Sequence, residues 1–200
     1  MQSACRRLCL AAHFAHFAPP CATFSLAARN RAFRSRKHLL GKPDLAPHAR
    51  QAVSLANTLL YFTCRLACEF YLAGIPGSIE NPIGSRMWIM RCMERTIRKT
   101  CAVKTSFAHC AFGARWRKAT TLAHWLSYEL SDLTTTCSSH GGICDHSSKH
   151  HLVLEGKLCA VAAAYPKLMC RKFARLISNK FMMKSINRMD RLVSPQPTHP

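Results

Sequence analysis

The sequence predicts an α/β domain with a largely parallel sheet, flanking helices and an additional irregular segment rich in cysteine and histidine. The chain has 200 residues and 48% hydrophobic content, enough for one domain with its own core. Short apolar runs that suit strands alternate with longer helical patterns over most of the chain. Residues 134–156 are instead polar and rich in serine, cysteine and histidine.

The first predicted element is a short buried strand in residues 10–17, which Pro19 and Pro20 end. Residues 29–42 are basic, polar and typical of a loop. The most regular helix is predicted for residues 47–73, because apolar side chains recur there at helical spacing without an internal proline or glycine.

Residues 78–80 predict the tip of a second strand, and Ser85 is suited to cap a second helix that extends to Ile97. Residues 103–112 and 120–126 follow as two strands separated by a basic turn, although the second run is also compatible with a helix.

Three parts are expected. Residues 1–133 form the core, residues 134–178 form the cysteine- and histidine-rich segment with a closing helix, and residues 179–200 form a disordered basic tail. The closing helix, at about residues 160–178, is interrupted by Pro166.

Charge is the unusual property of the composition. Lysine and arginine number 29 against 9 acidic residues, a formal net charge of +20, which predicts attraction to phosphates or anionic lipid headgroups. No apolar run reaches the roughly 18 residues of a membrane span. The positive charge favours nucleic acid, and DNA is the expected partner; no membrane span is expected.

The compartment is left with alternatives. The twelve cysteines are scattered through a chain that needs no disulfide framework, which favours reduced thiols and a nuclear or cytoplasmic location. The first 43 residues contain eight basic residues and no acid, which also suits an organellar transit peptide, while the apolar run after two arginines resembles a secretory signal.

Residues 19–25 read Pro-Pro-Cys-Ala-Thr-Phe-Ser. This string resembles the nucleophile loop of the cytosine-5 DNA methyltransferases, in which a thiolate adds to carbon 6 of the base. A cysteine suits this chemistry because part of it is already thiolate near neutral pH. The resemblance makes Cys21 the candidate nucleophile; the alternative is a turn with a structural cysteine.

Residues 79–82 read Ile-Glu-Asn-Pro and resemble the Glu-Asn-Val motif of the same family, with Pro82 in place of valine. The resemblance assigns Glu80 to hold the flipped cytosine and protonate its ring nitrogen, which requires a dry pocket that raises the carboxyl pKa. The alternative is a polar loop in which Glu80 caps a helix.

Residues 111–120 resemble the family motif in which an aromatic-glycine turn precedes paired basic residues. The resemblance implies phosphate contacts by Arg115, Arg117 and Lys118, because guanidinium groups grip phosphate through two parallel hydrogen bonds. A basic surface hairpin is the alternative.

A closer resemblance is to divergent methyltransferase-like frames of mobile elements, and it covers about residues 12–178. It adds Ala-Asn-Thr-Leu at residues 56–59 and places all the motifs in matching order. The fold implied is a partial Rossmann-like methyltransferase sheet. Only 20 residues, none of them glycine, precede Cys21, so the half that binds S-adenosylmethionine is expected to be missing or supplied by a complementing chain.

Metal ligands are the last candidates. The polar segment from Cys137 to His151 offers thiols and imidazoles at gaps that suit a tetrahedral zinc site, and the expected ligands are Cys137, His140, Cys144 and His146. A polar loop without metal is the alternative.

The resulting expectation is a truncated cytosine-5 methyltransferase-like protein that is inactive alone. Two alternatives stay open: a non-enzymatic basic protein that binds nucleic acid, and a reading frame with no selected function.

Overall fold

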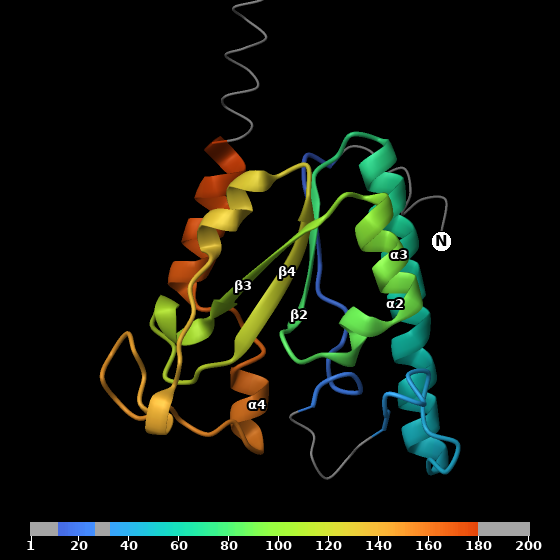
Figure 1. The fold of residues 1–200 in the computed structure, drawn as a ribbon, viewed down its shortest axis with the longest axis horizontal. Helices are drawn as coiled ribbons and strands as arrows, with labels where there is room; N and C mark the ends of the chain where they lie inside the picture. Colours follow the sequence, from blue (N-terminus) through green and yellow to red (C-terminus); the bar gives the residue numbers. More distant parts are fainter. Residues whose placement is uncertain (1–11, 27–32, 180–200) are drawn as a thin grey trace, which may run out of the picture.

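The computed structural model describes residues 12–26 and 33–179 of the chain (Figure 1). Expectations for the amino-terminal targeting segment and for the basic tail from residue 180 lie outside the described residues. In chain order the elements are β1 (Ala15–Phe17), α2 (Pro47–Leu72), β2 (Gly77–Pro82), η1 (Arg86–Ile89), α3 (Arg91–Lys99), β3 (Val103–Ala108), η2 (His109–Phe112), β4 (Ala119–Trp125), η3 (Tyr128–Leu133), η4 (His140–Gly142) and α4 (Lys157–Val161). Residues 167–179 are also helical.

The four strands form one mixed sheet in the order β1-β2-β4-β3. Strands β1 and β2 are parallel and are joined through α2, whereas β4 runs antiparallel to both β2 and β3. The prediction of a largely parallel sheet is therefore wrong. The physical reason is the link between β3 and β4, which runs from residue 109 to 118 and is too short for the helical crossover that parallel strands need.

Helix α2 has nearly the bounds that the sequence predicts. Pro47 lies in its first turn, where a fixed φ favours the helix and no backbone donor is needed. Its buried face includes Val53, Leu60 and Phe70, spaced for one side of a helix. The apolar pattern thus fixes both the extent of α2 and the face that packs on the sheet.

The second predicted helix is divided in two. Ser85 accepts a hydrogen bond from the backbone N–H of Met87 and caps η1, as its position predicts. Met90 then adopts an extended conformation, and α3 begins at Arg91. This break lets both Met87 and Met93 enter the core fully buried.

Apolar layers cover both faces of the sheet, and Figure 1 shows α2 and α3 on one side and the carboxyl-terminal helix on the other. Residues alternate along β4, so that Trp125 joins the core under α2 while Leu122 joins the second core. The second core includes Met169, and Phe173 from helical residues 167–179 packs against it.

Gly77 is required where β1, β2 and β4 meet. A Cβ atom there would collide with the Trp125 ring and lie 2.7 Å from the carbonyl oxygen of Ala15. Because the Trp125 indole N–H also donates to the Ile75 carbonyl at 2.9 Å, the ring cannot move aside cheaply. The close approach keeps the ends of β1 and β2 in register.

Candidate functional site

Two groups of reactive side chains lie at the ends of the strands. The first, called here the Cys21–Glu80 site, combines Cys21, which follows β1, with Glu80, which lies within β2. The parallel register pairs Phe17 with Ile79, so the segments after these residues leave the same edge of the sheet. Asn81 ties them together, because its side-chain amide donates to the carbonyl oxygen of Pro19 at 2.9 Å.

A tight turn holds the half-buried Cys21. The backbone N–H groups of Phe24 and Ser25 both donate to the carbonyl oxygen of Cys21, at 2.9 and 2.8 Å. Burial raises the pKa of the Cys21 thiol, and the carboxylate of Glu80 raises it further. Glu80 therefore lies close enough to Cys21 to influence its pKa, and the raised pKa favours the protonated thiol at neutral pH.

The acid of this site, Glu80, is buried, with 7% of its surface exposed. Burial raises the pKa of the Glu80 carboxyl, while Lys118 and a hydrogen bond with Tyr165 partly offset the shift. Its Oε1 atom is buried without a hydrogen-bond partner, and so is Oδ1 of the neighbouring Asn81. Such orphaned acceptors are rare in folded proteins and indicate a place for a donor group.

Tyr165 links Glu80 to a polar chain at the start of the sheet. Its hydroxyl lies 3.0 Å from Nε2 of His16, and Nδ1 of His16 lies 2.8 Å from Oγ of Ser78. Burial, followed by the charge of Glu80, raises the pKa of Tyr165, which keeps the phenol protonated. One proton arrangement satisfies all contacts: Ser78 donates to His16, His16 to Tyr165, and Tyr165 to Glu80.

The basic turn divides its predicted phosphate contacts between two environments. Arg115 and Arg117 are exposed, as a nucleic-acid contact requires. Lys118 is half-buried, donates to the carbonyl oxygen of Ala162 at 2.8 Å and lies close enough to Glu80 to influence its pKa. Lys118 thus belongs to the Cys21–Glu80 site, while the two arginines are exposed on the same turn.

Replacing Glu80 with glutamine is expected to stabilise the protein at neutral pH by about 1–2 kcal/mol, because the amide carries no charge into the buried site. The native pKa of Glu80 is raised above the reference value of 4.5, so the wild-type protein loses stability as pH rises through and above that value toward the native pKa. We therefore expect the gain in the free energy of unfolding from Glu80→Gln, measured with urea, to be larger at about pH 8 than at about pH 5.

Glu94→Gln on the exposed surface of α3 is the matched control and should leave both free energies of unfolding within about 0.5 kcal/mol. An equal effect of Glu80→Gln at both pH values would contradict the raised pKa of Glu80.

The second group is called here the cysteine–histidine cluster and lies at the far end of β3. Its ligand-type atoms all lie within 4.8 Å of one another, and they belong to Cys110, Cys137, Cys144 and His151. The three cysteines are buried and His151 is half-buried. This group could hold a metal ion such as zinc.

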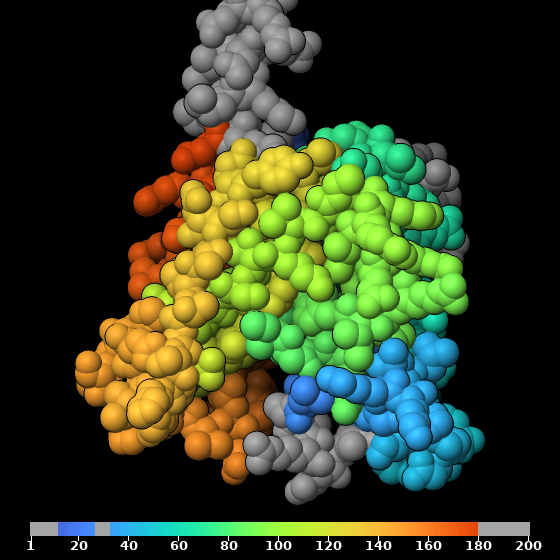
Figure 2. Space-filling view, viewed as in Figure 1, coloured from blue at the N-terminus to red at the C-terminus, as the bar shows by residue number. Residues whose placement is uncertain are grey.

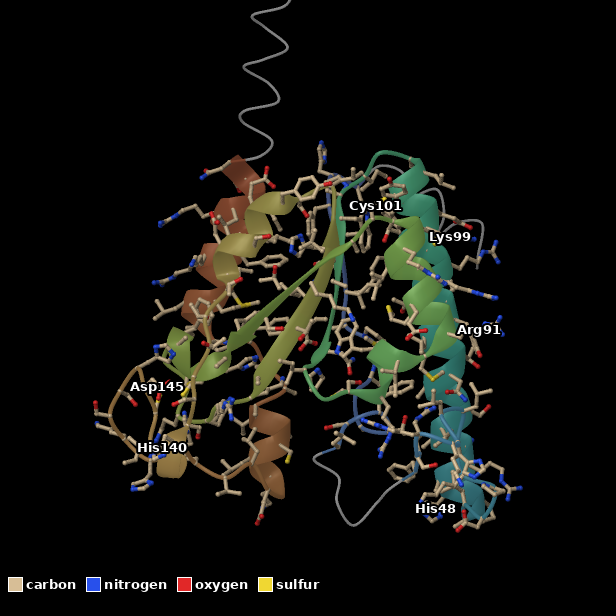
Figure 3. All side chains as sticks on the ribbon, viewed as in Figure 1. His48, Arg91, Lys99, Cys101, His140 and Asp145 are labelled. Atoms are coloured by element: carbon tan, nitrogen blue, oxygen red, sulfur yellow. The ribbon has the colours of Figure 1, made fainter. Side chains whose placement is uncertain are left out.

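The cluster shares Cys137 and Cys144 with the predicted ligand set and differs in its other two members. His146 lies outside it, with Nε2 at 2.8 Å from the carbonyl oxygen of Thr136. His140 is exposed and lies with Asp145 on the outer loop (Figure 3). Sequence reasoning missed Cys110 because it lies 27 residues before Cys137.

Hydrogen bonds shape the loop around the cluster. The backbone N–H of Cys144 donates to Lys149 O at 2.8 Å, and Asp145 accepts from the backbone N–H and the hydroxyl of Ser138. Burial would raise the pKa of Cys144, but hydrogen bonds from the Ser147 side chain and from the backbone of His146 and Ser147 outweigh it and lower the pKa to about 6. The loop therefore presents this sulfur ready to carry negative charge.

Among the described helices, none has the length and apolarity to cross a membrane. The chain matches no protein-family model, no curated protein and no solved structure.

Proposed function

We propose that the Cys21–Glu80 site receives a cytosine base taken out of a DNA strand, as the base-binding half of a cytosine-5 methyltransferase-like protein derived from a mobile element. The observation that supports this proposal is the buried carboxyl of Glu80, whose Oε1 lacks a partner and which lies close enough to the Cys21 thiol to influence its pKa. A flipped cytosine brings the complementary groups, since its amino group and protonated ring nitrogen are donors.

The residues support an attack on carbon 6 of the ring. The thiolate fraction of Cys21 forms the new bond to carbon 6, the electron pair of the C5–C6 double bond shifts through carbon 4 to the ring nitrogen, and the Glu80 carboxyl supplies the proton there. The raised pKa of Glu80 keeps part of it protonated above the usual range, which suits an acid. The raised pKa of Cys21 works against the attack, because it lowers the thiolate fraction at neutral pH.

Methyl transfer itself requires S-adenosylmethionine. Among the described strands, none is followed by a glycine-rich turn of the kind that holds a nucleotide cofactor, so these residues do not fit that group. We therefore assign no methyl-transfer step to them. A complementing chain would have to supply the part of the protein that binds S-adenosylmethionine.

Covalent trapping tests the proposal without a methyl donor. In single-stranded DNA that contains 5-azacytosine, a nitrogen replaces carbon 5 of the base. The Cys21 sulfur bonds to carbon 6, the electron pair of the C6–N5 double bond moves to N5, and N5 takes a proton. We expect an adduct of one chain with one DNA strand by mass spectrometry, forming faster from about pH 7 to about pH 9 as the thiolate fraction grows.

The adduct should be absent in Cys21→Ser and unchanged in Cys170→Ser, because Cys170 is an exposed thiol on the carboxyl-terminal helix. An adduct that survives Cys21→Ser, or none with the wild-type protein at any pH, would contradict the proposal.

A second candidate is a basic protein that binds nucleic acid without chemistry. It is favoured by the +20 charge and by exposed basic residues on α3, of which Arg91 and Lys99 are labelled in Figure 3. DNA binding that weakens steeply with salt, together with no adduct, would select this candidate.

A further inference from the structure

We propose that this chain binds one structural zinc ion through the four side chains of the cysteine–histidine cluster. Three thiolates and one imidazole form a donor set that soft, tetrahedral zinc prefers, and four protein ligands close the site to substrate. The proposal is independent of the Cys21–Glu80 site.

The distances suit one ion at the centre. A zinc–sulfur bond of about 2.3 Å in a tetrahedron implies roughly 3.8 Å between donor atoms. The Sγ of Cys137 lies 3.7 Å from Nε2 of His151, and all donor atoms lie within 4.8 Å of one another. Only a small contraction of the loop is therefore needed to reach bonding distance.

The histidine is held in the orientation that metal binding needs. Nδ1 of His151 lies 3.0 Å from Oγ of Ser139, while Nε2 faces the sulfur of Cys137. Metal-binding histidines usually have such a partner on the second ring nitrogen, which fixes the ring and its tautomer. His150, the residue before His151, is exposed and lies outside the cluster.

The segment that supplies three of the four ligands has no other core. Between residues 134 and 156 the only buried side chains are those of Cys137 and Cys144. The hydrophobic cluster there consists of these two, Cys110 and Ala108. Figure 2 shows the segment (orange) as a lobe at one corner of the molecule. A lobe without an apolar core is the usual setting of a structural metal.

The ion would join this lobe to the turn that borders the Cys21–Glu80 site. Cys110 lies in η2, and the backbone N–H of Leu152 donates to the Arg115 carbonyl oxygen at 2.8 Å. The lobe therefore contacts the turn from residue 109 to 118 at two places: through Cys110 in the cluster, and through the hydrogen bond to Arg115.

The test uses the full chain produced with zinc and kept under reductant. We expect one zinc per chain by elemental mass spectrometry and, after replacement by cobalt(II), the absorption bands of a tetrahedral thiolate site. His151→Gln should lower zinc affinity by about 100-fold or more in competition with a coloured chelator. His150→Gln, its neighbour, should leave zinc affinity unchanged.

Two further variants separate the observed ligand set from the one that sequence spacing predicts. His140→Gln and His146→Gln should both keep the zinc, and loss of zinc in either would overturn the proposed ligands. Ser139→Ala should weaken zinc binding by about 10–100-fold while the cobalt spectrum stays tetrahedral. This variant tests the role of His151 even if His151→Gln fails to fold.

A chain that contains no zinc, or one in which two of the three cluster cysteines form a disulfide, would overturn the proposal. Retention of full zinc affinity in His151→Gln would do the same.

Discussion

Replacing Arg34 with alanine is expected to lower the free energy of unfolding by about 3–5 kcal/mol, because it opens a cavity and leaves buried acceptors without donors. Arg34 is only 1% exposed, and its guanidinium group lies 3.9 Å from the centre of the Phe24 ring. It donates hydrogen bonds to the backbone carbonyl oxygens of Thr23, Leu39 and Val53. It also donates to two side-chain oxygens, Thr23 Oγ1 and Asn57 Oδ1.

Those acceptors come from three separate parts of the chain. Thr23 lies in the turn that holds Cys21, Leu39 in the following loop, and Asn57 on α2. Asn57 also donates to the carbonyl oxygen of Leu40 at 2.9 Å. Arg34 therefore holds the Cys21 turn to α2, so its loss should also make the Cys21 thiol react faster with an alkylating reagent.

Urea unfolding measures the stability change. Arg36→Ala, an exposed arginine in the same loop, is the control and should change the free energy of unfolding by less than about 0.5 kcal/mol. Arg34→Lys should recover only part of the loss, because an ammonium group cannot reproduce the planar set of donors. Equal stability of Arg34→Ala and Arg36→Ala would show that the hydrogen bonds of Arg34 contribute little.

Local patterns predicted the elements that depend on neighbouring residues. Helix α2 follows from helical spacing without proline or glycine, because that signal lies within the element itself. The apolar run of β4 was compatible with a strand or a helix, and pairing with β2 and β3 makes it a strand. The strand predicted at residues 103–112 is shorter in the structure, where η2 takes over at His109. The hydrogen bond from the His109 backbone N–H to the Arg117 carbonyl oxygen turns the chain there.

Features that depend on distant residues escaped the sequence. A basic, loop-like stretch gave no sign that Arg34 is buried, since its acceptors extend as far as Asn57 on α2. Candidate metal ligands were predicted from spacing within one loop, which selected Cys137 and Cys144 of the cysteine–histidine cluster but not Cys110, because only the folded sheet brings Cys110 near. Cys21 and Glu80 were paired through motif order, and the parallel register of β1 and β2 brings the segments that carry them to the same edge of the sheet.

Removing zinc with a strong chelator is expected to unfold the lobe of residues 134–152 while the sheet and α2 stay folded. In small peptides that fold around structural zinc, the apparent binding free energy of the ion is about 10–16 kcal/mol and drives folding. Burial of the two cysteines in this lobe supplies far less free energy of folding. Hydrogen exchange followed by mass spectrometry should therefore show protection lost in residues 134–152 and in the turn from residue 109 to 118.

Helix α2 serves as the internal control for that measurement, because its buried face, which includes Leu60 and Phe70, belongs to a different hydrophobic cluster from the one that contains Cys110. Its exchange should stay unchanged after chelation, and zinc added back should restore the protection of the lobe. If the lobe kept its protection without metal, its hydrogen bonds, such as that of Cys144 to Lys149, would be sufficient to hold it. If α2 lost protection as well, the metal would stabilise the whole domain, and the lobe and the sheet would unfold as one cooperative unit.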